Sequence, residues 1–159
     1  MQDYDYDILI RQWLWRYYDA KRDTIRLEHE YAEIVSIQES AGAISYDGMP
    51  ACGNTIHDLS DMVLVRDGAI SRLLRAKQKQ AKCYSEITQA ISKLDYSIER
   101  DIISMRYTYF SDGGRKTEWE DIAQKFNFSA SHVKRVHGIA IQKLIRIVGK
   151  RNLTRNDTK

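Results

Sequence analysis

The stretch WEDIAQKFNFSASHVKRVHGIAIQKL, Trp119 to Leu144, decides the fold of the C-terminal third of the chain. Ile122 and Ala123 supply the apolar face of a first helix, in which the small Ala123 lets a second helix cross closely. Asn127 stands between two phenylalanines and marks a tight turn, because asparagine tolerates the left-handed backbone better than most residues. The spacing therefore predicts two helices joined by a short turn.

The second helix is predicted to begin after Ser129, whose hydroxyl can accept a hydrogen bond from a backbone amide of the first turn. Val133 and Val136 turn inward. The apolar stripe is expected to continue through Ile139, Ala140, Leu144 and Ile147. The outward face of the first turns is short, polar and basic, and consists of Ala130, Ser131, His132, Lys134 and Arg135. Such a face can enter a major groove, so the stretch predicts a helix-turn-helix that binds double-stranded DNA.

The charge of the chain supports a polyanionic partner. From Ser129 onward the sequence holds eight basic residues and one acid, so this end carries +7, whereas the first 128 residues carry −4 of the formal net charge of +3. Clustered positive charge is rewarded by phosphate neutralisation and counterion release. A solvated basic tail is the alternative interpretation of the same charges.

The predicted DNA-contacting set joins Ser129 and the outward face to four further residues: Arg115, Lys116, Thr117 and Lys143. Adjacent helical residues diverge by about 100 degrees, so Lys134 and Arg135 cannot reach the same base. The guanidinium fork suits guanine, which assigns Arg135 to base reading and leaves Lys134 for a base or a phosphate. We expect His132 to neighbour a phosphate or a base, and Trp119 to be a packing anchor between the two helices.

The first 94 residues predict a long antiparallel helical hairpin, with helices at about 4–40 and 55–94 and a loop at 41–54 that contains the only proline. Apolar steps of three and four define two seams. The first runs through Ile10, Trp13, Tyr17, Ala20, Thr24, Leu27, Tyr31, Ile34 and Gln38. The second, weaker seam runs through Ile56, Leu59, Val63, Arg66, Ile70, Leu73, Lys77, Gln80, Tyr84, Ile87, Ile91 and Leu94.

Leu14, Trp15, Tyr18 and Ile25 lie off the first seam, and a two-helix hairpin cannot bury them. We interpret this surplus as a contact with a third helix or with a second subunit, and expect a homodimer or higher homo-oligomer.

The fold class is therefore expected to be all-α, with a hairpin at 1–94, a DNA-binding domain at 95–150 and a basic tail at 151–159. A short helix is expected around Asp95 to Tyr107, and the segment SDGGRKT, Ser111 to Thr117, separates it from the last third. No stretch alternates with period two, so no sheet is expected.

Other function classes find little support in the residues. The four histidines and two cysteines show no metal-ligand spacing, and no glycine loop resembles a phosphate cradle. The acids Glu118, Glu120 and Asp121 suit a helix start better than catalysis. We expect neither enzymatic activity nor a cofactor, and no export or membrane insertion, hence a cytoplasmic protein.

The segment Trp119 to Leu144, preceded by LDYSIERDIISMRY at Leu94 to Tyr107, resembles region four of bacterial sigma factors, which reads the promoter's −35 element. With its long N-terminal helices and glycine-bearing loop, the chain also resembles phage late-gene regulators of the RinA and ArpU type. The resemblance implies a transcription regulator in a bacterial host, contact with host RNA polymerase, and base reading by Ala130, Ser131, Lys134 and Arg135. Ala130 departs from the arginine common there in sigma factors, which argues against an ordinary −35 hexamer. The resemblance does not include sigma region two, so we do not expect the chain to act as a sigma factor by itself.

Two alternatives remain beside a transcriptional activator. One is a DNA-packaging protein resembling a small terminase subunit, which also joins a helix-turn-helix to an oligomerising hairpin. The other is a protein-interaction module with an incidental basic tail.

Overall fold

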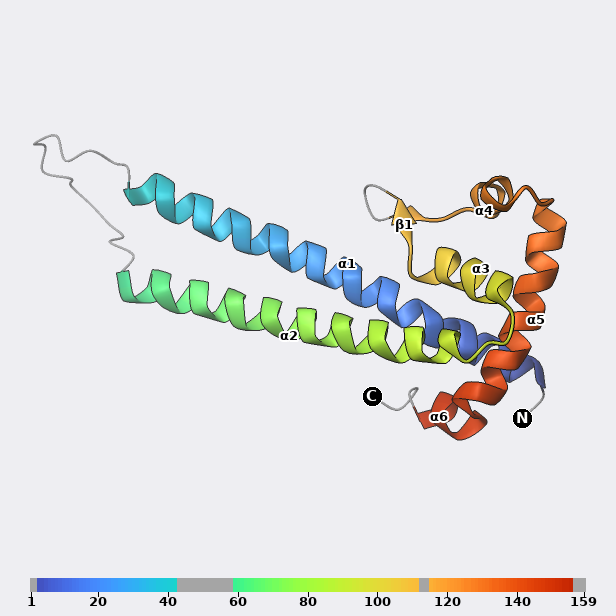
Figure 1. The fold of residues 1–159 in the computed structure, drawn as a ribbon. Helices are drawn as coiled ribbons and strands as arrows, with labels where there is room; N and C mark the ends of the chain where they lie inside the picture. Colours follow the sequence, from blue (N-terminus) through green and yellow to red (C-terminus); the bar gives the residue numbers. More distant parts are fainter. Residues whose placement is uncertain (1–2, 43–58, 112–114, 156–159) are drawn as a thin grey trace, which may run out of the picture. The chain divides into compact units, whose positions relative to one another are not determined.

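The computed structural model describes residues 3–42, 59–111 and 115–155 (Figure 1). The helices are α1 Asp3–Gly42, α2 Leu59–Ser92, α3 Ser97–Tyr107, α4 Trp119–Phe126, α5 Ala130–Val148 and α6 Lys150–Arg155. The strands are β1 Phe110–Ser111 and β2 Arg115–Lys116. The predicted helical class, with two long helices before a helix-turn-helix, is confirmed. The loop predicted at 41–54 lies outside the described residues from residue 43 onward.

A short β-hairpin was not expected from the sequence. β1 and β2 pair antiparallel, with Phe110 opposite Lys116 and Ser111 opposite Arg115. The expectation that the chain forms no sheet is therefore wrong at this point. Each strand has two residues, and alternation of apolar and polar residues cannot be recognised over such a length.

The chain divides into two compact units, Lys21–Lys79 and the combination of Met1–Ala20 with Gln80–Lys159. In the first, α1 and α2 are antiparallel, because Gln38, Glu30 and Glu28 meet successively later residues of α2. Gln38 Nε2 donates to the Met62 carbonyl at 2.8 Å. Arg72 and Lys77 form ion pairs with Glu30 and Glu28 at 2.6 and 2.9 Å. In the other unit Arg16 pairs with Glu86 of α2 at 2.9 Å, which follows the same antiparallel order.

The predicted seam of α1 is confirmed. Its nine residues from Ile10 to Gln38 are all buried or half-buried. The seam predicted for α2 is confirmed only in part. Ile87, Ile91 and Leu94 are buried, and Ile70, Leu73 and Gln80 are half-buried. Val63 and Tyr84, by contrast, are 55% and 46% exposed. Small side chains beside this seam also turn inward, and they recur every seven residues: Ala69, Ala76, Cys83 and Ala90.

The part of α1 from Ile10 to Tyr17 shares a core with the C-terminal helices. Leu14 is fully buried there with Ile87 of α2, Ile103 of α3 and Leu144 of α5. The ring centroids of Trp15 and Tyr107 lie 4.6 Å apart. Tyr18, also off the seam, packs its ring 5.1 Å from that of Phe110. For Leu14 and Trp15 the structure therefore shows the predicted contact with a third helix of the same chain, whereas Tyr18 packs on β1 and Ile25 is half-buried.

The sequence predicted a domain boundary at residue 94. The structure has no boundary there, because one compact unit includes residues on both sides of it. The region predicted as a basic tail also begins differently. Residues 150–155 form α6, and Leu153 is buried in the same core. None of the described helices combines the length and the apolar character needed to cross a lipid bilayer.

Candidate nucleic-acid interface

A capped turn joins α4 to α5 as the sequence predicts. Asn127 adopts the left-handed conformation, with φ 54° and ψ 39°. The amide of Phe128 donates to the Ala123 carbonyl at 2.9 Å. Ser129 caps α5, since its Oγ accepts a hydrogen bond from the His132 amide at 3.2 Å. Both the left-handed turn and the N-cap are therefore confirmed.

A small second core fixes the two helices against α3. It consists of Ile102, Ile122, Ala123 and Val133, and Val136 is half-buried against it. Ala123, which is 6% exposed, fills the position where the sequence predicted a close helix crossing. The acids at the start of α4 also take their predicted place, because the Glu118 amide donates to Asp121 Oδ2 at 3.4 Å.

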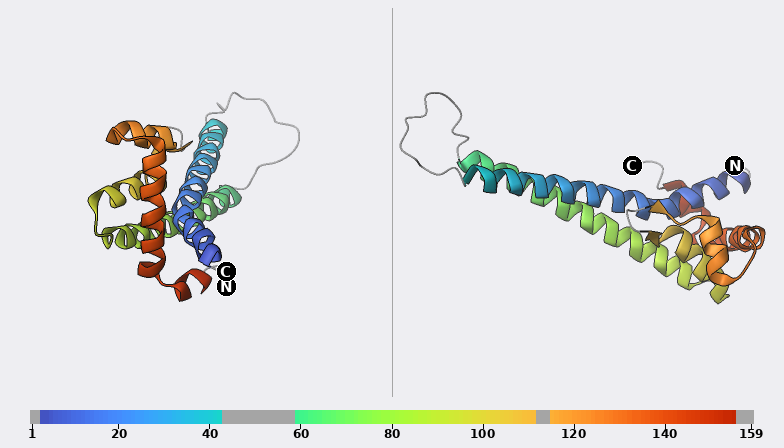
Figure 2. Two further views of the ribbon diagram at one scale, coloured as in Figure 1. Left: turned by 90° about the vertical axis from the view of Figure 1, so that its right-hand side faces the viewer. Right: turned by 90° about the horizontal axis from the view of Figure 1, so that it is seen from above.

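The opposite face of the first two turns of α5 is open. Ser131, Lys134 and Arg135 are exposed, and His132 is half-exposed. Nη2 of Arg135 lies 3.1 Å from Nδ1 of His132, whose ring lies 4.8 Å from that of Phe128. The left view of Figure 2 looks onto α5 with α3 and α4 beside it. Four predicted contact residues thus lie together at the start of one helix.

Ala130 and Ile139 differ from their predicted positions. Ala130 is half-buried against the second core, and therefore does not belong to the outward face. Ile139 was expected to turn inward but is 48% exposed. Ala140 and Leu144 are buried as predicted, and the inward stripe beyond Val133 also includes His137, Ile141 and Ile145.

His137 is a buried polar residue that the sequence analysis did not single out. It is 2% exposed, its Nε2 lies 3.0 Å from the Tyr107 hydroxyl, and its ring lies 4.8 Å from that of Trp119. Burial, followed by the charges of Arg11 and Arg106, lowers the pKa of His137 to about 4. Burial also raises the pKa of Tyr107 to about 12. The spacing of His137, four residues after Val133 and three before Ala140, could have placed it on the buried stripe.

Trp119 is a packing anchor, as predicted, because it joins α4 to His137 of α5. The guanidinium carbon of Arg106 lies over the Trp119 ring at 4.5 Å and over Trp15 at 5.5 Å. Arg106 also donates a hydrogen bond to the Thr117 carbonyl. A single cation therefore connects α1, α3 and the start of α4.

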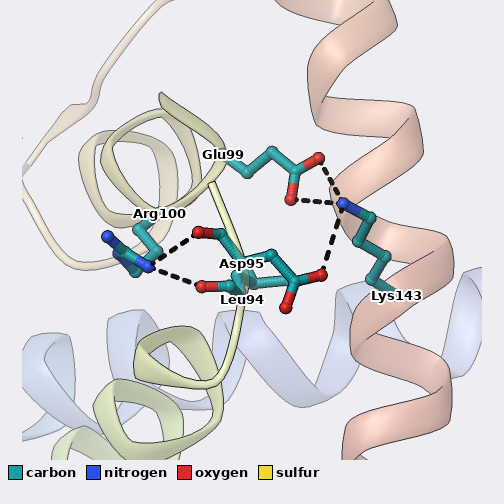
Figure 3. Close-up of polar contacts among 5 residues, drawn as sticks. All are labelled: Leu94, Asp95, Glu99, Arg100 and Lys143. Atoms are coloured by element: carbon teal, nitrogen blue, oxygen red, sulfur yellow. Dashed lines mark hydrogen bonds and ion pairs between the residues drawn. The ribbon is translucent and has the colours of Figure 1, made fainter. Parts of the chain in front are cut away.

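Lys143 faces α3 rather than the open face of α5 (Figure 3). Its Nζ lies 2.7 and 2.9 Å from the two carboxylate oxygens of Glu99, and 3.9 Å from Asp95. The hydrogen bond to Glu99 raises the pKa of Lys143. Glu99 is buried, at 5% exposed, so its carboxylate needs the ammonium group of Lys143 as a partner. Lys143 therefore has a structural role in the contact between α3 and α5. Figure 3 also shows Arg100, which donates to the Leu94 carbonyl at 2.6 Å and so closes the turn before α3.

The predicted contacts at 115–117 lie on β2 and the residue after it. Lys116 places its Nζ 4.0 Å from the centroid of Trp15 and 4.8 Å from that of Tyr18. Thr117 is half-buried and donates through Oγ1 to the Tyr109 carbonyl at 3.1 Å. Arg115 is exposed. Lys116 and Thr117 therefore hold the β-hairpin against its own unit.

The described part of the chain shows no cluster of three metal-ligating side chains. Cys83 is a buried free thiol, while Cys52 lies outside the described residues.

Residues 90–145, about a third of the chain, match the family model for region 4 of sigma-70 factors. No curated protein and no solved structure matches the chain. The match covers α3, the β-hairpin, α4 and most of α5, but does not bear on the resemblance to RinA and ArpU. Together with the capped turn and the open polar face of α5, it indicates a DNA-binding helix-turn-helix with a transcription-related function.

Proposed function

We propose that the chain is a sequence-specific regulator of transcription that reads double-stranded DNA with the first two turns of α5. The observation that carries this proposal is the open face of Ser131, Lys134 and Arg135, set on a helix whose other face is buried. Phosphates and guanine edges attract such side chains, and the helix diameter suits a major groove.

Arg135 and Lys134 have different roles in this proposal. The contact between Nη2 of Arg135 and Nδ1 of His132 holds the guanidinium near the first turn of α5. From there its two-pronged donor can bind O6 and N7 of guanine. Lys134 precedes Arg135 by one residue, so its side chain points about 100 degrees away around the helix, and we assign it to a phosphate. On this basis Arg135→Ala weakens cognate binding by roughly 1–3 kcal/mol and binding to random DNA far less.

The experiment uses the full chain and a cognate duplex selected from a random pool. Isotherms at several salt concentrations on cognate and random duplexes separate the two roles, because loss of one phosphate contact weakens both duplexes and flattens the salt slope by about one unit. Arg75→Ala, at an exposed position of α2, is the matched control and leaves both affinities unchanged. Equal affinity of the parent for cognate and random duplexes would overturn the proposal.

At its promoter the protein is proposed to contact host RNA polymerase in the bacterial cytoplasm and to activate phage or prophage late genes. The resemblance to region four of sigma factors and to the phage regulators supports this finer statement. Transcription in vitro from the footprinted promoter, with purified polymerase, tests it. Unchanged or reduced transcript in the presence of the protein would contradict activation.

We also propose a homodimer or higher homo-oligomer, but its contact surface consists of other residues than those predicted from the sequence. Leu14 and Tyr18 are engaged within the chain, but the unit Lys21–Lys79 exposes a set of large apolar side chains: Ile37, Val63, Leu64, Val65 and Leu74. Exposed apolar surface of this kind favours association. Sedimentation of the parent and of Leu64→Glu tests this part, and a monomeric parent at micromolar concentration would contradict it.

A further inference from the structure

Gly138 occupies the middle of α5, where the fold gives no reason for a glycine. Glycine is the least favourable helix residue after proline. A Cβ atom added at Gly138 would meet no atom of the described residues within 4 Å. The residue follows an ordinary helical backbone, so no left-handed conformation requires it either. The missing side chain therefore does not serve the packing of this chain.

The next residue, Ile139, is a large apolar side chain on the same open face. It is 48% exposed and lies one helical turn after Arg135, so the two side chains are neighbours along the helix. Gln142, one further turn along, is also exposed. The open face of α5 thus continues past the basic pair into a turn that combines a glycine with an isoleucine.

We infer that this third turn of α5 also contacts DNA, with Gly138 leaving room for the duplex to approach closely and Ile139 packing against the C5-methyl group of a thymine. The inference rests on the proposed function and extends it to the identity of a base. In the major groove the thymine methyl is the apolar feature that separates T from C, and an apolar side chain reads it by contact. Lys134 and Arg135 lie on the same face of α5. Phosphates and base acceptors would pair with these two cations, whereas an apolar protein surface would leave them without partners, so the face favours DNA.

The first test uses two matched glycines. Gly68, in the third turn of α2, is exposed, and a Cβ added there also meets no atom of the described part of the chain within 4 Å. Gly68→Ala and Gly138→Ala should each raise the melting temperature, by roughly 2 °C for a chain of this size. Gly138→Ala alone should weaken cognate binding, by on the order of tenfold, as expected when a methyl group holds two close surfaces apart. Unchanged cognate affinity of Gly138→Ala would overturn the close approach.

The second test removes the methyl group from the DNA. Each thymine of the selected site is replaced in turn by deoxyuridine, which keeps the base-pairing edge and lacks the methyl. The parent should lose affinity at one position by about fourfold, the expected effect of one buried methyl group. Ile139→Ala should bind the thymine and deoxyuridine duplexes equally at that position, whereas Arg75→Ala should behave as the parent. A site without a sensitive thymine, or equal sensitivity of Ile139→Ala and the parent, would overturn the inference.

These outcomes are distinguishable from failure of the proposed function. If the parent does not prefer its selected duplex to random DNA, the proposed function fails. If the preference exists but both third-turn variants retain it in full, only the inference fails. If those variants keep their DNA affinity and lose transcription with polymerase, the third turn binds a protein, and the assignment to thymine is wrong.

Discussion

His137 makes the stability of the DNA-binding helices sensitive to mild acid. Its pKa of about 4 in the folded chain lies below the value of about 6.5 expected in an unfolded chain. Between these values the unfolded state binds a proton that the folded state does not, so the free energy of unfolding decreases as pH falls from 6.5 toward 4. The slope is about 1.4 kcal/mol per pH unit, which amounts to about 2 kcal/mol at pH 5 and about 3 kcal/mol at pH 4.

The measurement is urea unfolding followed by helical circular dichroism between pH 7.5 and pH 5, where most carboxyl groups stay ionised. His137→Gln removes the titrating group, and its amide can still accept a hydrogen bond from Tyr107. The variant is less stable than the parent at pH 7.5 but loses about 2 kcal/mol less on acidification to pH 5. His29→Gln, at an exposed position of α1, is the control and should follow the parent. Parallel pH profiles for the parent and His137→Gln would refute the reasoning.

Three further substitutions test how the site is held. Ser129→Ala removes the cap of α5 and should destabilise the chain by about 1 kcal/mol in urea unfolding; no change would mean that the cap bond to His132 is unimportant. Lys143→Met leaves Glu99 buried without its ammonium partner, so the urea midpoint should fall while DNA affinity of the folded protein is retained. A fully folded variant with reduced DNA affinity would show that Lys143 contacts DNA. Leu14→Ala should destabilise by about 2–5 kcal/mol, and hydrogen exchange should show faster opening of α5 as well as α1; an effect confined to α1 would contradict the shared core.

Local signals were sufficient for the turn and its cap. Asn127 and Ser129 act through their own backbone and their nearest neighbours, so their roles can be inferred from a few adjacent residues. The same holds for Ala123, where small size within an apolar stripe indicates a close crossing. These features locate the open face of α5 from the sequence alone.

Partners that are distant in sequence could not be inferred in this way. Lys143 was placed at the DNA because of its charge, yet Glu99, 44 residues earlier, holds its ammonium group. The prediction for α2 followed large side chains, so it missed small ones that also turn inward, such as Ala69 and Ala90. It also expected Val63 and Tyr84 to turn inward, where the structure exposes them. An isoleucine was expected to turn inward at 139, although Ile141 and Ile145 already fill that face.

The start of α1 packs within the same compact unit as the DNA-binding helices. Trp15 packs on Tyr107 and lies beneath the cations Arg106 and Lys116. Arg106 in turn holds the Thr117 carbonyl and the Trp119 ring. A chain of contacts thus leads from α1 to the start of α4 without using the turn at Asn127. The orientation of the helix-turn-helix is therefore determined twice, once by the small second core and once by these aromatic and cationic contacts. Because Trp15 lies about ninety positions before Arg106 and Tyr107 in the sequence, a fragment that begins at residue 95 retains the cap, the turn and the contacts of Arg106 with Thr117 and Trp119. It loses the contacts of Trp15 with Tyr107, Arg106 and Lys116.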